Sequence, residues 1–175
     1  RDALGEALAN ARQAKDTYKD QVTSAAAAVL DYALATAQNV YDDENADSAA
    51  LNEQMELIVA AQETYVEFAE GRAALRDAVT DAEALLAESE VGDGYGQHPV
   101  SAKEALVRVI DSCEELLLDE SVTDVSLYID KSSLLANQVK AFENNDNTTL
   151  SIPEISVVNM DIVKGDPSYL VDGSN

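Results

Sequence analysis

The chain has 175 residues, of which 46% are hydrophobic and only 5% aromatic. Eleven basic residues against 34 acidic ones give a formal net charge of −23, which would repel phosphate backbones and anionic membrane surfaces. One Cys and one His supply neither an internal disulfide nor a multi-histidine metal site. We therefore expect neither a conventional hydrolase nor a metalloenzyme, and no cofactor, metal or nucleic-acid partner.

Long stretches rich in Ala, Leu, Glu and Gln and free of Gly and Pro favour helices. Apolar residues recur at spacings of three and four from Leu51 to Ala69 and from Ala102 to Leu117, which is typical of amphipathic helices. The pattern predicts six helices, at about residues 2–19, 24–42, 48–70, 72–89, 101–119 and 124–143. Ser101 fits a capping box at the start of the fifth helix. Thr123 or Asp124 can cap the sixth.

The first three predicted helices are similar in sequence to the next three. Arg1 and Leu4 of the first predicted helix align with Arg72 and Leu75 of the fourth. A constant shift of 76 aligns the later helices and places Leu30 over Leu106, Leu51 over Leu127, and Ile58 over Leu134. We expect an all-α fold of two tandem up-down-up three-helix bundles, residues 1–70 and 71–145.

Only Glu70-Gly71-Arg72 separates the third predicted helix from the fourth. Because one Gly costs a helix only about 1 kcal/mol, these two helices can run together as one. That continuity would hold the two bundles end to end as a rod.

The last segment, residues 146–175, differs in composition. Ile and Val dominate around Pro153, which favours extended chain. We expect a linker or the first strand of a following domain, although a tail lying back along the second bundle is also consistent with the sequence. The chain has no apolar run long enough to span a membrane. It begins without Met or a leader, and we interpret it as a piece of a longer or processed protein.

The run from Val91 to Leu106 carries a distinctive loop motif, Gly92-x-x-x-Gly96-Gln97-His98-Pro99-x-Ser101-Ala102-Lys103. This motif and the Ala-rich helix after it resemble the FIVAR module of bacterial cell-surface proteins, over about seventy residues. The motif is moderately specific, because the helices around it are merely Ala-rich. His98 stands where that family more usually has a Tyr. The first repeat has Lys19 to Ser24 in place of the loop, so its membership depends on the internal repeat alone.

The resemblance implies a secreted or surface-anchored, multi-domain bacterial protein associated with polysaccharide binding or degradation, and it supplies no catalytic residues. We expect a monomeric, non-catalytic spacer or interaction module whose partners are the neighbouring domains of the same polypeptide. The alternative is an adhesin module that binds a glycan or a host protein through a helix face or through residues 91–99.

The candidate binding residues are Tyr95 and His98, whose rings could stack on a sugar; the competing interpretation is that they cover the end of the bundle. The three glycines of this loop make a poor phosphate site, because a helix precedes them and Asp93 would repel the anion. The acidic run 42–47 lacks the Gly of a calcium loop and is interpreted as a cap between helices. Cys113 lies on an apolar stripe, as a buried small hydrophobe does. Four tyrosines in the first repeat are expected in the core or at its boundary: Tyr18, Tyr32, Tyr41 and Tyr65.

Overall fold

The computed structural model describes residues 1–147, and every regular element in that part is a helix. The described region has five helices: α1 (Asp2–Tyr18), α2 (Ser24–Asp42), α3 (Ser48–Glu88), α4 (Val100–Leu118) and α5 (Ser126–Glu143). The expected all-α class is therefore confirmed. The extended segment predicted for residues 146–175 lies, from residue 148 onwards, outside the described residues.

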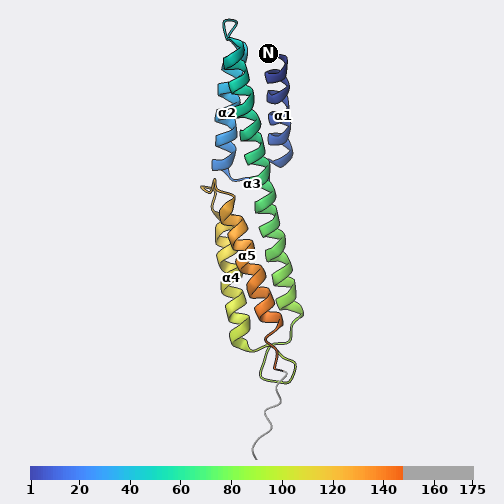
Figure 1. Cartoon of the computed structure of the whole chain (residues 1–175). Helices are drawn as coiled ribbons and strands as arrows, with labels where there is room; N and C mark the ends of the chain where they lie inside the picture. Colours follow the sequence, from blue (N-terminus) through green and yellow to red (C-terminus); the bar gives the residue numbers. More distant parts are fainter. Residues whose placement is uncertain (148–175) are drawn as a thin grey trace, which may run out of the picture.

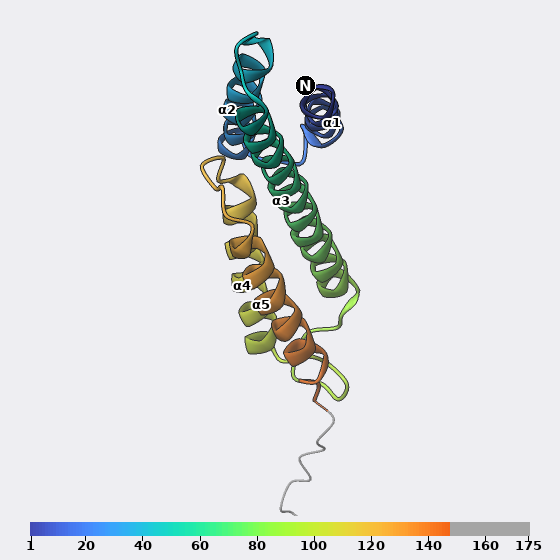
Figure 2. The same ribbon diagram turned by 45° about the horizontal axis from the view of Figure 1, so that its top comes forward.

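The third and fourth predicted helices, at 48–70 and 72–89, do run together: α3 is a single helix of 41 residues that passes through Gly71, so the predicted continuity is confirmed and the described chain has five helices in place of six. At 1.5 Å per residue α3 is roughly 60 Å long. One glycine inside such a long run removes too little helical propensity to end it. Figure 2 shows α3 as an unbroken coil along the molecule.

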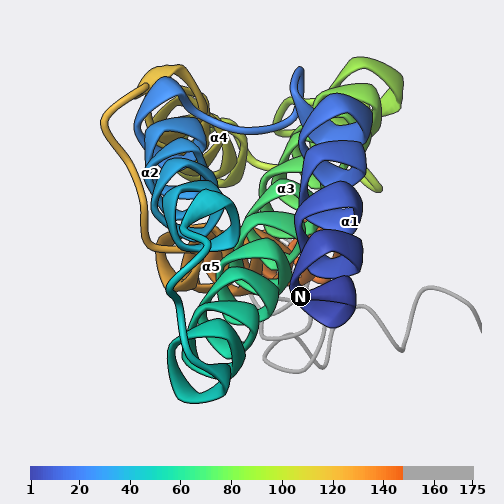
Figure 3. The same cartoon turned by 90° about the horizontal axis from the view of Figure 1, so that it is seen from above.

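The other four helices lie in pairs along α3. α1 and α2 pack against its first half and against each other, and α4 and α5 do the same along its second half. The result is an elongated molecule with the N-terminus near one end and the last turns of α5 near the other (Figure 1). In the end-on view of Figure 3, α2 lies over α4. No helix among residues 1–147 has both the length and the apolar character that crossing a membrane requires.

The core consists mainly of Ala, Leu and a few large rings. Alanines such as Ala11, Ala37 and Ala69 are at most 1% exposed, and their small side chains let the helices approach closely. Phe68, Tyr128 and Phe142 fill the wider spaces and are also almost completely buried.

Burial does not follow the predicted alignment of the first half of α3 with α5. Ile58 is buried, but Leu134, its predicted equivalent at a shift of 76, is 48% exposed. Leu135 is buried instead, and the buried Tyr65 likewise corresponds to Phe142. The buried residues of these two helices are thus 77 positions apart, one more than the predicted shift. Leu30 in α2 and Leu106 in α4, which the predicted shift of 76 aligns, are both buried.

The helix starts agree only partly with the predicted caps. α4 begins at Val100 after Pro99, which has no side-chain cap, so Ser101 lies inside the first turn and the predicted capping box is wrong. The N-cap residue of α5 is Val125, which has no side-chain cap, although Asp124 just before it accepts a hydrogen bond from the Ser126 backbone N–H at 2.9 Å. In the first half of the chain, Thr23 and Asp47 cap α2 and α3 through their side chains.

Candidate functional site

The loop with Tyr95 and His98 joins α3 to α4 at the end of the molecule farther from the N-terminus. Its two arms are paired by backbone hydrogen bonds, from Gly92 N to His98 O at 3.0 Å and from His98 N to Glu90 O at 2.9 Å. Asn147, beyond α5, closes the loop by donating from its backbone N to Gln97 O and from its side chain to Gly92 O, both at 2.9 Å. The loop therefore has a fixed shape.

The glycines of the motif make room for the Gln97 side chain. Gln97 Oε1 accepts a hydrogen bond from Gly94 N at 2.8 Å. A Cβ atom on Gly92 would lie 2.3 Å from the same oxygen, so a larger residue cannot occupy that position without displacing Gln97. Gly96 has φ +76°, in the left-handed region that glycine adopts most readily. The Gly-x-x-x-Gly-Gln spacing thus forms a turn folded around Gln97.

The two predicted binding residues have different surroundings. The His98 ring stacks on Phe142 with centroids 4.2 Å apart and an interplanar angle of 22°, and its Nδ1 lies 3.2 Å from Asn145 O. Tyr95 is 70% exposed. His98 covers the end of the core, whereas the Tyr95 ring is presented to solvent.

The acidic run 42–47 is organised as a helix-capping turn. Asp43 Oδ1 accepts from Asn45 N at 2.9 Å, and Asp47 Oδ1 accepts from Ala50 N at 2.8 Å. The Arg1 guanidinium donates to the backbone oxygens of Tyr41 and Asp43. Within residues 1–147, no three His, Cys, Asp or Glu side chains are grouped as a metal ion would require.

Cys113 is fully buried, and this burial raises the pKa of its thiol. Its position agrees with the prediction of a packing role. Tyr65 is buried, and Tyr18 and Tyr41 lie at the core boundary. Tyr32 is 77% exposed, so its predicted place in the core or boundary is wrong.

The most extensive polar arrangement lies at the middle of the molecule and surrounds Arg72, which is 7% exposed. Its guanidinium donates to Val22 O at 3.0 Å, before α2, and to Leu117 O at 2.7 Å, near the end of α4. It also forms an ion pair with Glu120 at 3.1 Å. One side chain of α3 therefore binds both flanking helix pairs. We call residues 19–24, Arg72 and residues 117–123 the junction.

The two loops of the junction also bind each other directly. The buried Thr23 hydroxyl donates to Val122 O at 2.6 Å. Glu120 accepts from Ser24 N at 2.7 Å through its carboxylate, and from Ala25 N at 3.2 Å through its backbone oxygen. These bonds satisfy amides at the start of α2 that lack partners within the helix.

Tyr128 packs beneath Arg72, with its ring edge-on to Phe68 at a centroid distance of 5.2 Å. Burial raises the pKa of Tyr128, and the nearby positive charge of Arg72 opposes this rise. Among the residues described, the Tyr128 hydroxyl and Arg72 Nε are the buried side-chain polar atoms with no hydrogen-bond partner. Burial around Arg72 thus leaves two polar atoms without a hydrogen-bond partner.

Gly71 provides the close approach of α3 to the start of α5. A Cβ atom at this position would lie 2.7 Å from Val125 Cγ2 and 4.0 Å from Tyr128 Cβ. The contact is shorter than any ordinary carbon–carbon contact, so the glycine is needed for packing and not for a helix break.

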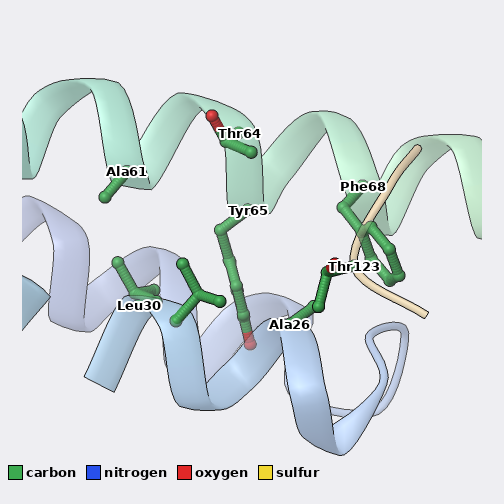
Figure 4. Close-up of a pocket in the computed structure, with 8 residues that line it drawn as sticks. Ala26, Leu30, Ala61, Thr64, Tyr65, Phe68 and Thr123 are labelled. Atoms are coloured by element: carbon green, nitrogen blue, oxygen red, sulfur yellow. The ribbon is translucent and has the colours of Figure 1, made fainter. Parts of the chain in front are cut away.

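A small cavity lies beside the junction, between α2, α3 and the α4–α5 loop (Figure 4). Its volume of about 30 Å³ is far below that of a small-molecule site. The Tyr65 side chain points from α3 across the cavity toward α1 and α2, and its hydroxyl lies 3.4 Å from the backbone oxygen of Lys15 in α1. The lining is mostly apolar: Ala26, Val29, Leu30, Ala61, Thr64, Tyr65, Phe68 and Thr123.

The junction was not predicted from the sequence. A signal was present, because Arg72 lies three residues after Ala69 and three before Leu75, both of which are buried on the core side of α3. A charged residue on an apolar stripe indicates a buried partner. The acceptors, however, are backbone oxygens of remote loops, which a sequence pattern does not reveal.

Comparison of the chain with protein-family models, curated proteins and solved structures found no match.

Proposed function

We propose that this chain is a non-catalytic helical spacer and interaction module, built as two tandem three-helix bundles and belonging to a secreted or surface-anchored bacterial multi-domain protein. The observation that carries the proposal is the junction: α3 runs through it unbroken, and the buried Arg72 binds carbonyls from both helix pairs. The function is mechanical, because the module sets the distance and orientation between the domains at its two ends.

The tandem organisation is supported by equivalent buried positions. Leu4 in α1 corresponds to Leu75 in the second half of α3, and Ala37 in α2 corresponds to Cys113 in α4; all four are at most 1% exposed. We infer one bundle from α1, α2 and the first half of α3, and a second from the other half of α3 with α4 and α5.

Stiffness at the junction follows from its hydrogen bonds. Bending the two halves apart would separate Arg72 from Val22 O or Leu117 O and leave buried polar groups unpaired. Each such group costs about 1–3 kcal/mol, and more if charged. The junction therefore resists bending more than a bare helix does.

The proposed setting depends on the loop motif that resembles the FIVAR module. The structure accounts for part of the motif: Gly92 leaves room for the Gln97 side chain, and His98 stacks on Phe142. A net charge of −23 favours a solvated, monomeric particle. These features support a surface setting beside polysaccharide-binding or polysaccharide-degrading domains.

The test measures the distance between spin labels at Asn10 and Glu104, both exposed, in a Cys113→Ala background. We expect a narrow distance distribution, because the two bundles are held at one angle. Arg72→Gln should broaden it, while Arg76→Gln, exposed and one turn further along α3, should not. A broad distribution in the unsubstituted chain would contradict the proposal.

A second candidate function, direct binding of a glycan or host protein, is favoured by the exposed ring of Tyr95 on a fixed loop. An aromatic face can cover a sugar ring by stacking. The test is a glycan array probed with the whole chain and with Tyr95→Ala. Saturable binding that this substitution removes would support an adhesin role.

A further inference from the structure

The end of the molecule near the N-terminus repeats half of the junction. Arg72 donates to Leu117 O near the end of α4, and Arg1 donates to Tyr41 O near the end of α2. Tyr41 precedes Leu117 by 76 positions, the same shift that relates α2 to α4. Each arginine also stands three residues before an equivalent core leucine, Leu4 or Leu75.

The loops after the two helices have the same turn. Asp43 Oδ1 accepts from Asn45 N at 2.9 Å, and Asp119 Oδ1 accepts from Ser121 N at the same distance. The next carboxylate is also repeated, because Glu44 takes the place of Glu120. The acceptors that the junction uses therefore have counterparts at this end.

The two places differ in what covers them. At the junction, the loop before α2 covers Arg72, which is 7% exposed, and its Thr23, Ser24 and Ala25 donate to the α4–α5 loop. At the N-terminal end, Arg1 and Glu44 are both exposed. We define the N-terminal end face as Arg1 together with residues 41–46.

We propose that the N-terminal end face is a docking surface for a further three-helix unit of this same type, placed as the first half of the chain is placed on the second. The incoming unit would present a loop like residues 19–24, with a hydroxyl and free amide donors at a helix start. Its last helix would continue into α1, as the first half of α3 continues through Gly71. This inference rests on the proposed tandem organisation.

The chemistry of the surface fits this occupant. At the junction, the Glu120 carboxylate, Glu120 O and Val122 O accept from backbone N–H and hydroxyl groups of residues 23–25. The corresponding acceptors of the N-terminal end face are the carboxylate and backbone oxygen of Glu44 and the backbone oxygen of Ala46. Arg1 has donors for a carbonyl in the position of Val22 O, which Arg72 binds at 3.0 Å. Val125 is the residue of the second half that lies against Gly71. The corresponding residue of the first half is Ser48, whose side chain is smaller.

The test extends the full chain with a second copy of residues 1–71 placed directly before Arg1. This makes Glu70-Gly71-Arg1 at the new joint, like Glu70-Gly71-Arg72 in the natural one. Spin labels are placed at Asn10 of the added copy and at Ala28, which is exposed and corresponds to Glu104. A second sample carries the natural Asn10–Glu104 pair in the same extended chain.

We expect the new pair to give a narrow distribution centred at the distance of the natural pair. Arg1→Gln should broaden it, whereas Arg12→Gln, exposed on α1, should not. A broad new pair beside a narrow natural pair would overturn this inference and leave the spacer proposal standing. A narrow distance distribution for the new pair that Arg1→Gln does not broaden would also overturn this inference. Continuity of the helix alone would then explain the fixed distance. If both pairs are broad, the spacer proposal fails and this inference fails with it.

Discussion

His98 and Tyr95 are three residues apart in one loop, yet their rings do different things. His98 stacks on the buried Phe142, and Tyr95 faces solvent. We expect His98→Ala to lower the free energy of unfolding by about 1 kcal/mol, the usual worth of an aromatic pair. Tyr95→Ala should change it by less than about 0.5 kcal/mol, as exposed sites do. Urea unfolding followed by circular dichroism measures both, and His98→Phe, which keeps the stacking, is the control. Equal losses in the two alanine variants would contradict this assignment.

We expect Tyr65 and Tyr128 to make the stability of the fold sensitive to alkaline pH. Burial raises the pKa of both hydroxyls above their ordinary value, so the folded chain keeps these protons where the unfolded chain loses them. Their contribution to stability is fully present below about pH 10, the unfolded value, and is lost as the pH rises through the folded values.

Tyr128→Phe should therefore reduce the loss of stability between neutral and strongly alkaline pH. It should cost little at pH 7, because the hydroxyl that it removes has no hydrogen-bond partner. Urea unfolding over a pH series tests this, with the exposed Tyr32→Phe as the matched control. An alkaline decline as steep in Tyr128→Phe as in Tyr32→Phe would show that Tyr128 does not contribute.

At the scale of the element, α3 carries a glycine where helix propensity alone would favour alanine. Gly to Ala inside a helix ordinarily gains about 1 kcal/mol. At position 71 the new methyl would meet Val125 Cγ2 at 2.7 Å, and overpacking of this kind costs about 1–3 kcal/mol. We expect Gly71→Ala to lower the free energy of unfolding.

The double variant Gly71→Ala/Val125→Ala should recover part of that loss, since it removes the clashing atom. A double-mutant cycle by urea denaturation measures the coupling between the two positions. Purely additive effects would show that the contact with Val125 is not what requires the glycine.

At the scale of the whole molecule, the charge of −23 opposes the compact state by self-repulsion. Raising NaCl from 10 to 300 mM shortens the screening length, from about 30 Å to below about 10 Å. We expect a gain of about 1–2 kcal/mol, or roughly 3–6 °C in Tm for a chain of this size. Differential scanning calorimetry measures it.

Calcium provides the control for this salt effect. Because the acidic run 42–47 is used in caps and turns, CaCl2 should raise Tm no more than MgCl2 at the same concentration. A calcium-specific rise would indicate a cation site in this run.

Local pattern predicted the helices well, because three- and four-residue apolar spacing and the lack of breakers depend on nearby residues only. It predicted the end of α2 at Asp42 and the burial of Cys113. It failed where the burial or the partner of a residue depends on residues far away in the sequence. The predicted alignment matched Leu134 with the buried Ile58, whereas Leu135 is the buried residue, and the role of Arg72 depended on the carbonyls of Val22 and Leu117. For the candidate site, the loop motif located His98 and Tyr95, but only the packing against Phe142 separates their roles.

Because α3 belongs to both halves, its backbone hydrogen bonds continue through the junction without interruption. Unfolding that starts at one end is not expected to stop at the junction. Loss of either helix pair would expose apolar side chains of α3, the helix against which the other pair also packs. We expect the amide hydrogens of α3 on both sides of Gly71 to show the same, high protection from hydrogen exchange. Heating or applied force would then unfold the two halves in one step and not one after the other.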